Sequence, residues 1–316
     1  MSIHIMGSVA FDRIMSYQGN INELILKDKD KYNTLSLLML IDRIEEKQGG
    51  TGANIAFNLA MLGETSHLYT AVGYDFTGNY QKKLLDMHIN LDGVNIREKE
   101  LTACGHVIAD SKGNLINCFC PAAMNNSCNE AVLSVIKAGD YGIVSPAFAE
   151  DMAKFPKIFK ERNVPYIYDP GQQIPAVSKE DHLASIDGAE ILIGNDYEIA
   201  LISEITGLSK EELLEKCKYI VTTLGDKGAS ISQKGKADIL VAAPKIAQLA
   251  DPTGAGDSMR AGLLKGLTAG FDLETSLKLG SICSAFCIEK YGTQEHSYTL
   301  ETFRSRYEEN YGSCPL

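Results

Sequence analysis

The feature that most constrains the fold is a repeated alternation of short apolar runs and amphipathic stretches. Six runs have the length and β-branched content of buried strands, and most end in Gly, Asp or Pro. They are Ile3–Met6, His67–Val72, Gly142–Ser145, Pro165–Asp169, Glu190–Gly194 and Tyr219–Leu224. Helical patterns such as Gly52–Leu62 and Ser209–Lys218 lie between them. This alternation predicts an α/β fold, doubly wound around a mostly parallel sheet with helices on both faces.

Two segments interrupt this alternation. Residues 14–47 contain no clear crossover helix and end in an extended apolar run, Leu35–Ile41. Ala103–Asp110 and Asn114–Cys120 alternate around Ser111-Lys112-Gly113, which is typical of a hairpin. Strands without crossover helices predict a small antiparallel sheet that stands off the main body, although simple surface loops are an alternative.

We therefore predict two domains. A small β lid is formed by residues 14–47 and 101–120, and a large α/β domain that binds nucleotide and substrate is formed by residues 1–13, 48–100 and 121–316.

Charge and composition exclude several functional classes. The net charge of −11 argues against a nucleic-acid surface, which requires clustered Lys and Arg. No segment approaches the ~20 apolar residues of a membrane helix, and the N-terminus lacks a secretion signal, so we expect no membrane association and a cytoplasmic location. The 8 cysteines include no Cys-x-x-Cys pair, which favours reduced, buried thiols over zinc or disulfides.

The strongest chemical signal is Asp251-Pro-Thr-Gly-Ala-Gly-Asp257, followed by the helical run Ser258–Ala269. Small residues at Gly254, Ala255 and Gly256 allow a backbone to approach an anion, and the helix directs free N–H groups toward it. The helix dipole should keep Asp257 ionised, so that it can accept a proton. The alternative is a tight turn with a stabilising acidic residue.

A second glycine turn, Gln48-Gly-Gly-Thr-Gly-Ala-Asn54, precedes the first strongly helical run. It is not a dinucleotide-binding fingerprint, because Ile55 stands where the third glycine is required. A purely structural turn is the alternative.

Asp12 follows the first predicted strand, at the end of a parallel sheet where ligands bind. Its two oxygens match a vicinal diol. Taken alone, a carboxylate after a strand is more often a turn residue.

Asn195 and Glu198 follow another predicted strand and lie three residues apart, so they face the same way. Their oxygens suit Mg²⁺ held through water, and a helix capping box is an equal alternative. Thr222-Thr-Leu-Gly-Asp-Lys-Gly228 is by itself a weak turn signal. No Walker-type phosphate loop or protein-kinase signature occurs in the chain.

Taken in order from Gly7 to His296, these motifs resemble the ribokinase-like (PfkB) carbohydrate and nucleoside kinases. Five segments are similar to the bacterial adenosine-kinase-like branch of that family: Gly7–Asp12, Phe119–Asn125, Tyr168–Gln173, Asn195–Glu198 and Tyr291–His296. The chain departs from the family at Ser258-Met259, where Ala-Phe is usual, and at Pro121-Ala-Ala-Met124, where the branch has Pro-Gly-Ala-Met.

The resemblance implies a role for each motif. It makes Gly254, Ala255 and Gly256 an anion hole and Asp257 the catalytic base. The sugar of the substrate would be held by Asp12, Gly49, Gly50 and Asn54. The nucleotide would contact Asn195, Thr223, Gly225 and Gly228, with Mg²⁺ held through water by Glu198, and K⁺ by Asp251 and Thr253.

The implied reaction is transfer of the γ-phosphoryl group of ATP to the 5′-hydroxyl of a nucleoside, with adenosine as the first expectation. Phe11, Tyr17 and Phe119 are candidates to stack on the base, and a place in the core is an equal alternative for each. We also expect a homodimer formed through the lid. Three alternatives stay open: a sugar kinase of the same fold acting on ribose, fructose or a related sugar, a non-catalytic nucleotide-binding regulator, and a dinucleotide-dependent oxidoreductase.

Overall fold

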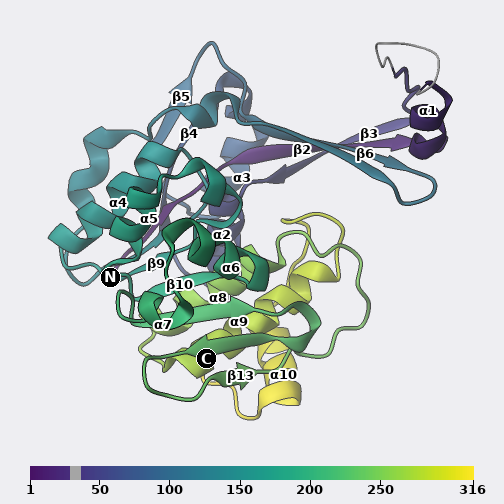
Figure 1. The fold of residues 1–316 in the computed structure, drawn as a ribbon. Helices are drawn as coiled ribbons and strands as arrows, with labels where there is room; N and C mark the ends of the chain where they lie inside the picture. Colours follow the sequence, from purple (N-terminus) through teal and green to yellow (C-terminus); the bar gives the residue numbers. More distant parts are fainter. Residues whose placement is uncertain (29–36) are drawn as a thin grey trace.

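The computed structural model describes residues 1–28 and 37–316 (Figure 1). Its main sheet has 9 strands in the order β13-β12-β11-β10-β9-β8-β1-β4-β5. The strands are β1 (Ile3–Met6), β4 (Ser66–Gly73), β5 (Val94–Arg97), β8 (Tyr141–Val144), β9 (Tyr166–Tyr168), β10 (Ile191–Asn195), β11 (Tyr219–Thr223), β12 (Ala229–Ser232) and β13 (Ile239–Val241). The strands from β11 to β5 pair in parallel, and β12 and β13 add an antiparallel edge. All six predicted strands are present, and the doubly wound α/β fold is confirmed.

Helices cover both faces of this sheet, because its strands are apolar on both sides. In β10, Ile191 and Ile193 belong to one apolar cluster, whereas Leu192 between them belongs to the other. The first cluster includes residues of α2 (Thr51–Met61), α3 (Asn79–Asp86), α8 (Ala255–Thr268) and α9 (Leu273–Ile288). The second includes residues of α4 (Ala149–Glu161), α5 (Lys179–Ile186), α6 (Asp196–Thr206) and α7 (Lys210–Leu213). Near the C-terminus, α10 (Leu300–Tyr311) packs on α9.

The predicted helix Ser209–Lys218 is much shorter than expected. It begins with a capping box between Ser209 and Glu212 but ends at Leu213. The chain must then turn to enter β11, and the amide of Lys218 already donates to the carbonyl of Ala189 beside that strand. Short 3₁₀ turns complete the described elements: η1 (Tyr74–Phe76), η2 (Ala122–Asn125), η3 (Glu130–Val135), η4 (Gly171–Ala176) and η5 (Gly225–Lys227).

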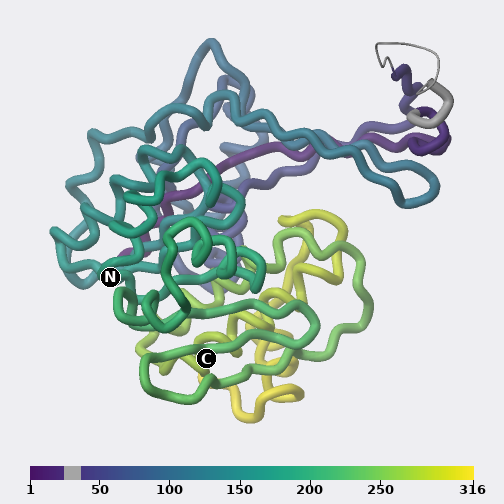
Figure 2. The backbone as a smooth tube through the Cα atoms, in the orientation of Figure 1, coloured from purple at the N-terminus to yellow at the C-terminus, as the bar shows by residue number. Residues whose placement is uncertain are grey.

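The lid is a separate four-stranded sheet with the order β3-β2-β6-β7. Its strands are β2 (Ala10–Tyr17), β3 (Arg43–Gly49), β6 (Ala103–Asp110) and β7 (Leu115–Cys120). The lid extends from the body as a twisted arm, with helix α1 (Ile21–Asp28) at its far end (Figure 1). The smooth backbone trace shows that β2 and β6 both run outward along this arm (Figure 2).

Two expectations about the lid are corrected. The sheet is mixed rather than antiparallel, because β2 and β6 leave the body in the same direction and pair in parallel. Helix α1 lies between the antiparallel neighbours β2 and β3, so it is not a crossover helix, in agreement with the sequence. The predicted run Leu35–Ile41 is not a strand in its described part: residues 37–41 precede β3, and residues 35 and 36 lie outside the described residues.

Within the described chain, the helices are too short or too polar to cross a bilayer.

Candidate active site

The N-terminus of α8 begins at a left-handed residue. Gly254 has φ 80° and is the N-cap, so the helix starts at Ala255, three residues before the predicted start at Ser258. A Cβ at Gly254 would lie 2.9 Å from Cγ2 of Thr293, so no larger residue fits without a shift.

Three of the amides at this helix end are free to bind a ligand. The amide of Ala255 donates to the carbonyl of Pro252 at 3.3 Å. The amides of Gly254, Gly256 and Asp257 have no acceptor among residues 1–28 and 37–316. The structure thus brings together the predicted cradle, although Ala255 is already partly engaged and the amide of Asp257 adds a donor.

Asp257 is held by a side chain from another helix. Asn54 of α2 donates from Nδ2 to Asp257 Oδ2 at 2.8 Å. The Asn54 Oδ1 atom accepts from Thr293 Oγ1 at 3.0 Å and from Gln294 Nε2 at 2.9 Å. Because those two donors occupy the amide oxygen, the Nδ2 group must point toward the carboxylate. The sequence did not predict this contact between two of its own candidates.

Burial raises the pKa of Asp257 to about 7, and the nearby positive charge of Arg260 only partly opposes this effect. The expectation that the helix dipole keeps Asp257 fully ionised at neutral pH is therefore wrong for the protein without ligands. A pKa near neutrality suits a residue that accepts a proton during catalysis.

The residues that orient Asn54 continue toward the lid. Gln294 Nε2 also donates to the hydroxyl of Tyr80 at 2.8 Å, and Tyr80 donates to the carbonyl of Gly49 at 2.6 Å. A chain of hydrogen bonds therefore connects the end of lid strand β3 with the carboxylate of Asp257. Thr293 and Gln294 belong to the segment Tyr291–His296, which the sequence singled out only by its resemblance.

Asp12 lies on lid strand β2, directly opposite Gly105 of β6. Its carboxylate occupies space that two glycines leave open: a Cβ at Gly49 or at Gly105 would lie 2.6 Å from one of its oxygens. Burial, and secondarily the charge of Asp251, raises the pKa of Asp12. In the described part of the chain, nothing donates a hydrogen bond to this carboxylate. Two acceptor oxygens are thus available to a ligand.

Gly50 has a structural reason to be glycine. It is the N-cap of α2 with φ 93°, and a Cβ would lie 2.5 Å from the amide nitrogen of Ala10. Gly50 is therefore required by the turn itself, as the structural alternative for this motif predicted. The same turn places Asn54 in the first turn of α2.

Asn195 and Glu198 form the capping box of α6 that the sequence left open as an alternative. Asn195 Oδ1 accepts from the amide of Glu198, and Glu198 Oε2 accepts from the amide of Asn195, both at 2.8 Å. The charge of Glu198 still acts on Arg260, so it lies near the site. Because no three His, Cys, Asp or Glu side chains of the described residues form a metal cage, the donor set fits a hydrated Mg²⁺ better than a fully dehydrated one.

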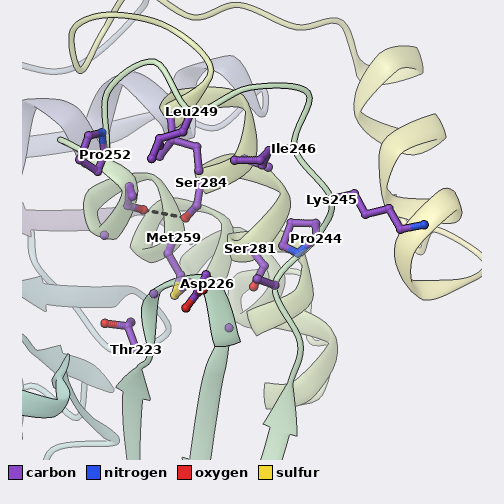
Figure 3. Close-up of a pocket in the computed structure, with 17 residues that line it drawn as sticks. Thr223, Asp226, Pro244, Lys245, Ile246, Leu249, Pro252, Met259, Ser281 and Ser284 are labelled. Atoms are coloured by element: carbon purple, nitrogen blue, oxygen red, sulfur yellow. Dashed lines mark hydrogen bonds between the residues drawn. The ribbon is translucent and has the colours of Figure 1, made fainter.

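A cavity of about 460 Å³ opens beside the N-terminus of α8 (Figure 3). The predicted residues Thr223, Gly225 and Gly228 line one side, and Ala255 and Gly256 line another. Its remaining wall is largely apolar and includes Ile246, Leu249, Met259 and Ile288. The volume and the mixture of apolar wall and backbone donors suit a nucleotide whose phosphates reach the helix end.

The loop before α8 is fixed by Asp251. Its Oδ1 accepts from the amide of Thr253 at 2.9 Å, and its Oδ2 accepts from the amide of Gly292 at 3.1 Å. Asp251 therefore caps the loop and ties it to the segment that carries Thr293.

The three aromatic candidates differ in position. Phe11 is buried in the core against Tyr80, and Tyr17 lies five residues beyond Asp12 on β2. Phe119 is 55% exposed and pairs with Gly105, so it stands on the same lid face as Asp12.

A charged pair that the sequence did not predict lies beneath the cradle. Arg260 of α8 is 7% exposed and donates from Nη2 to Oδ1 of Asp169 at 2.6 Å, while its Nε forms an ion pair with Oδ2. The signal available in the sequence was an arginine three residues after Asp257, on a helix that is otherwise apolar there.

Comparison with known proteins gives consistent results over nearly the whole chain. The sequence model of the pfkB family of carbohydrate kinases matches residues 12–300. A nucleoside kinase of Methanocaldococcus jannaschii is 32% identical over 269 residues, which cover 83% of this chain and 86% of that protein. The structure of Burkholderia thailandensis nucleoside kinase with inosine has a TM-score of 0.84 at 28% identity and covers 99% of both chains. Its complex described as ADP-inosine has a TM-score of 0.82 at 29% identity, covering 99% of this chain and 97% of that one.

Proposed function

The chain belongs to the pfkB family of carbohydrate kinases and is a phosphotransferase with an alcohol group as acceptor, and we propose that its acceptor is a nucleoside. The observation that carries the proposal is the carboxylate of Asp257, placed among free main-chain donors and held by Asn54. The full-length likeness to nucleoside kinases, one of them with bound inosine, supports the choice of acceptor. A cytosolic location, where ATP is available, is part of the proposal.

In the proposed reaction the 5′-oxygen of the nucleoside attacks the γ-phosphorus of ATP. A bond forms between that oxygen and phosphorus, the bond from phosphorus to the leaving oxygen of ADP breaks, and the hydroxyl proton passes to Asp257. The amides of Gly254, Gly256 and Asp257 stabilise the charge on the transferring group, with a smaller contribution from Ala255. This electrostatic effect is usually the largest contribution to such a rate enhancement.

We propose that Asp12 accepts hydrogen bonds from the two ribose hydroxyls. Its unpartnered oxygens and the space left by Gly49 and Gly105 support this role. Gly49 and Gly50 would pack against the ribose, while the second Nδ2 hydrogen of Asn54 is left for a ring hydroxyl. Phe119 is the aromatic side chain best placed to stack on the base.

The nucleotide is proposed to occupy the cavity beside α8, with Thr223, Gly225 and Gly228 against its ribose and phosphates. Asn195 and Glu198 would hold hydrated Mg²⁺, which neutralises phosphate charge when bound. Asp251 and Thr253 belong to the loop where a K⁺ ion would lie. Assays in which a bulky organic cation replaces K⁺ test whether K⁺ binds at this loop.

Adenosine remains the first acceptor to test. The decisive experiment is ADP release with ATP and Mg²⁺, measured in parallel with adenosine, inosine, guanosine, ribose and fructose, with the phosphorylated product identified by mass. The proposal is supported if a nucleoside is phosphorylated at least tenfold more efficiently than either sugar. A tenfold difference corresponds to about 1.4 kcal/mol of discrimination between the acceptors. Efficient phosphorylation of ribose or fructose alone would make the protein a sugar kinase.

We also propose that two copies associate through the lid. Several apolar side chains of the described arm are largely exposed, and the most exposed are Leu38 at 92%, Leu40 at 85% and Ile44 at 64%. Leu38 and Leu40 lead directly into edge strand β3, which carries Ile44. An exposed apolar segment beside an unpaired strand edge favours contact with another chain.

A further inference from the structure

The guanidinium of Arg260 lies near the N-terminus of its own helix, α8, where a positive charge is unfavourable. Helical side chains lean toward the N-terminus, and Arg260 follows this rule along the face of Gly256, one turn earlier. Its Nη1 atom lies so near that a Cβ at Gly256 would be only 2.6 Å away. A buried positive charge therefore sits at the positive end of the α8 dipole, which is electrostatically unfavourable.

Asp169 compensates for only part of this arrangement. Its carboxylate accepts a hydrogen bond from Nη2 and forms an ion pair with Nε, whose N–H has no hydrogen-bond acceptor in the described chain. Within residues 1–28 and 37–316, however, no group accepts a hydrogen bond from Nη1. The side chain of Arg260 is more than nine-tenths buried, but Nη1 is not one of its fully enclosed polar atoms, so this donor is open to water and to an anionic ligand from outside the chain.

The position of Nη1 indicates which anion that is. It lies beside Gly256, whose own amide is free and which lines the nucleotide cavity. The charges of Asp257 and Glu198 both act on Arg260. The donor without a protein acceptor thus lies near both the proposed base and the residue proposed to hold Mg²⁺.

We propose that Arg260 is a catalytic residue whose Nη1 donates to an oxygen of the transferring phosphoryl group, while Asp169 positions the guanidinium. The proposal rests on the proposed function, because it needs a phosphoryl donor in the cavity beside α8. It also explains why Gly256 carries no side chain: any Cβ would displace Nη1 from the cradle.

The test compares Arg260→Met and Arg260→Lys with the wild type. Arg162→Met is the matched control, because Arg162 is a partly buried arginine whose Nη1 donates to the carbonyls of Leu133 and Ile136, away from the site. Three quantities are measured: kcat as a function of pH, the KM for the nucleoside, and the affinity for ADP with Mg²⁺, with and without aluminium fluoride as a mimic of the transferring group.

For Arg260→Met we expect kcat to fall by roughly 10²–10³-fold at every pH, with a nearly unchanged nucleoside KM. The gain in ADP affinity caused by aluminium fluoride should disappear, while ADP alone still binds. Arg260→Lys should lose most of kcat as well, because an ammonium cannot bridge Asp169 and the phosphoryl oxygen in the geometry of a guanidinium. Arg162→Met should behave like the wild type.

Two results would overturn the proposal. One is an unchanged kcat; the other is a loss that vanishes at high pH, which would mean that Arg260 acts only on the ionisation of Asp257. If Arg260→Met does not fold, the double variant Arg260→Met/Asp169→Leu removes both buried charges and should fold, since neutral replacement of a buried ion pair is often tolerated. It must show the same loss of the aluminium fluoride effect. A wild-type enzyme that phosphorylates only sugars would refute the nucleoside assignment but leave this test intact.

Discussion

At the scale of single residues, the site depends on which partners the side-chain oxygen and nitrogen of Asn54 bind. Its oxygen is occupied by Thr293 and Gln294, so its nitrogen is committed to Asp257. A carboxylate fixed in this way needs no reorientation before it accepts a proton, which is the geometric condition for a general base.

The first prediction concerns Asp257→Asn. Loss of the general base should lower kcat by roughly 10²–10⁴-fold while ADP still binds, as shown by steady-state kinetics and calorimetry. Glu64→Gln is the control, because Glu64 pairs with Lys265 near the opposite end of α8. Activity of Asp257→Asn within a few-fold of the wild type would remove Asp257 from this role.

The same variant should change stability in a defined direction. The pKa of Asp257 is raised from 3.8 to about 7 on folding, so the folded protein keeps a proton that the unfolded chain has lost. The contribution of this group to the free energy of unfolding therefore decreases as the pH rises from about 4 to about 7. We expect Asp257→Asn to raise the Tm relative to the wild type at about pH 8 and to change it little at about pH 4. An equal shift at both pH values would contradict the raised pKa.

For the wild type, kcat/KM should increase with pH through a single ionisation near pH 7 and then level off. The reason is that only the unprotonated carboxylate of Asp257 can accept the hydroxyl proton. A pH series of initial rates at low nucleoside concentration measures this pKa in the free enzyme. A profile that is already flat at about pH 5 would show that the group ionises in the usual range.

Asp12→Ala should raise the nucleoside KM by roughly 10- to 10²-fold, because two hydrogen bonds to a charged acceptor are lost. The KM for ATP should stay the same, since Asp12 lies on the lid sheet and does not line the cavity beside α8. Asp42→Ala is a suitable control: among the described residues, the carboxylate of this exposed lid residue accepts only from the amide of Gln18. An unchanged acceptor KM for Asp12→Ala would refute the diol assignment.

Most residues of the candidate site could be found from the sequence, but their contacts could not. Asp257, Asn54 and Asp12 stand in recognisable motifs, whereas the bond between Asp257 and Asn54 joins residues 203 positions apart and depends on how α2 packs on α8. Arg260 was missed for the same reason, because its partner Asp169 follows a strand 91 residues earlier.

At the scale of elements, the N-terminus of α8 depends on one left-handed glycine. Gly254 allows the chain to enter the helix directly from the loop that Asp251 fixes. If it were absent, the helix would start at a different residue and its free amides would point elsewhere.

Gly254→Ala should destabilise the protein by about 1–2 kcal/mol and also reduce kcat, because a left-handed alanine is strained and its Cβ meets Thr293. Gly270→Ala is a closely matched control. Gly270 has φ 81°, almost the same as the 80° of Gly254, but a Cβ there would meet nothing within 4 Å. Chemical denaturation should show a loss of stability in both variants, larger for Gly254→Ala because only its Cβ meets Thr293, whereas only Gly254→Ala should lose activity. Equal kcat values for Gly254→Ala and Gly270→Ala would show that the helix cap at Gly254 does not contribute to catalysis.

Local sequence patterns predicted the parallel strands well because those strands are buried on both faces. The sequence missed β5 and the antiparallel edge strands β12 and β13, which are short, and β13 is mostly exposed. It also placed the start of α8 three residues late, because Ala255-Gly256 has the composition of a turn.

At the scale of the whole molecule, the lid is an arm that projects from a compact body (Figure 1). Ile44→Lys places a charge among the exposed apolar side chains of this arm and should shift the proposed dimer toward monomer in sedimentation experiments. Lys82→Glu is the control, because this exposed residue pairs with Asp86 on α3 of the body. A wild-type protein that is monomeric at micromolar concentration would contradict association through the lid.

The strand β2 carries Asp12, and β1 leads into it after three residues, Gly7–Val9. The carboxylate proposed to hold the ribose is therefore part of the arm itself, so this contact and the arm cannot move independently. If the arm swings away from the body, the proposed contact with the ribose is lost with it. An enzyme built in this way would complete its site only when the acceptor is in place, which would limit hydrolysis of ATP while the acceptor is absent.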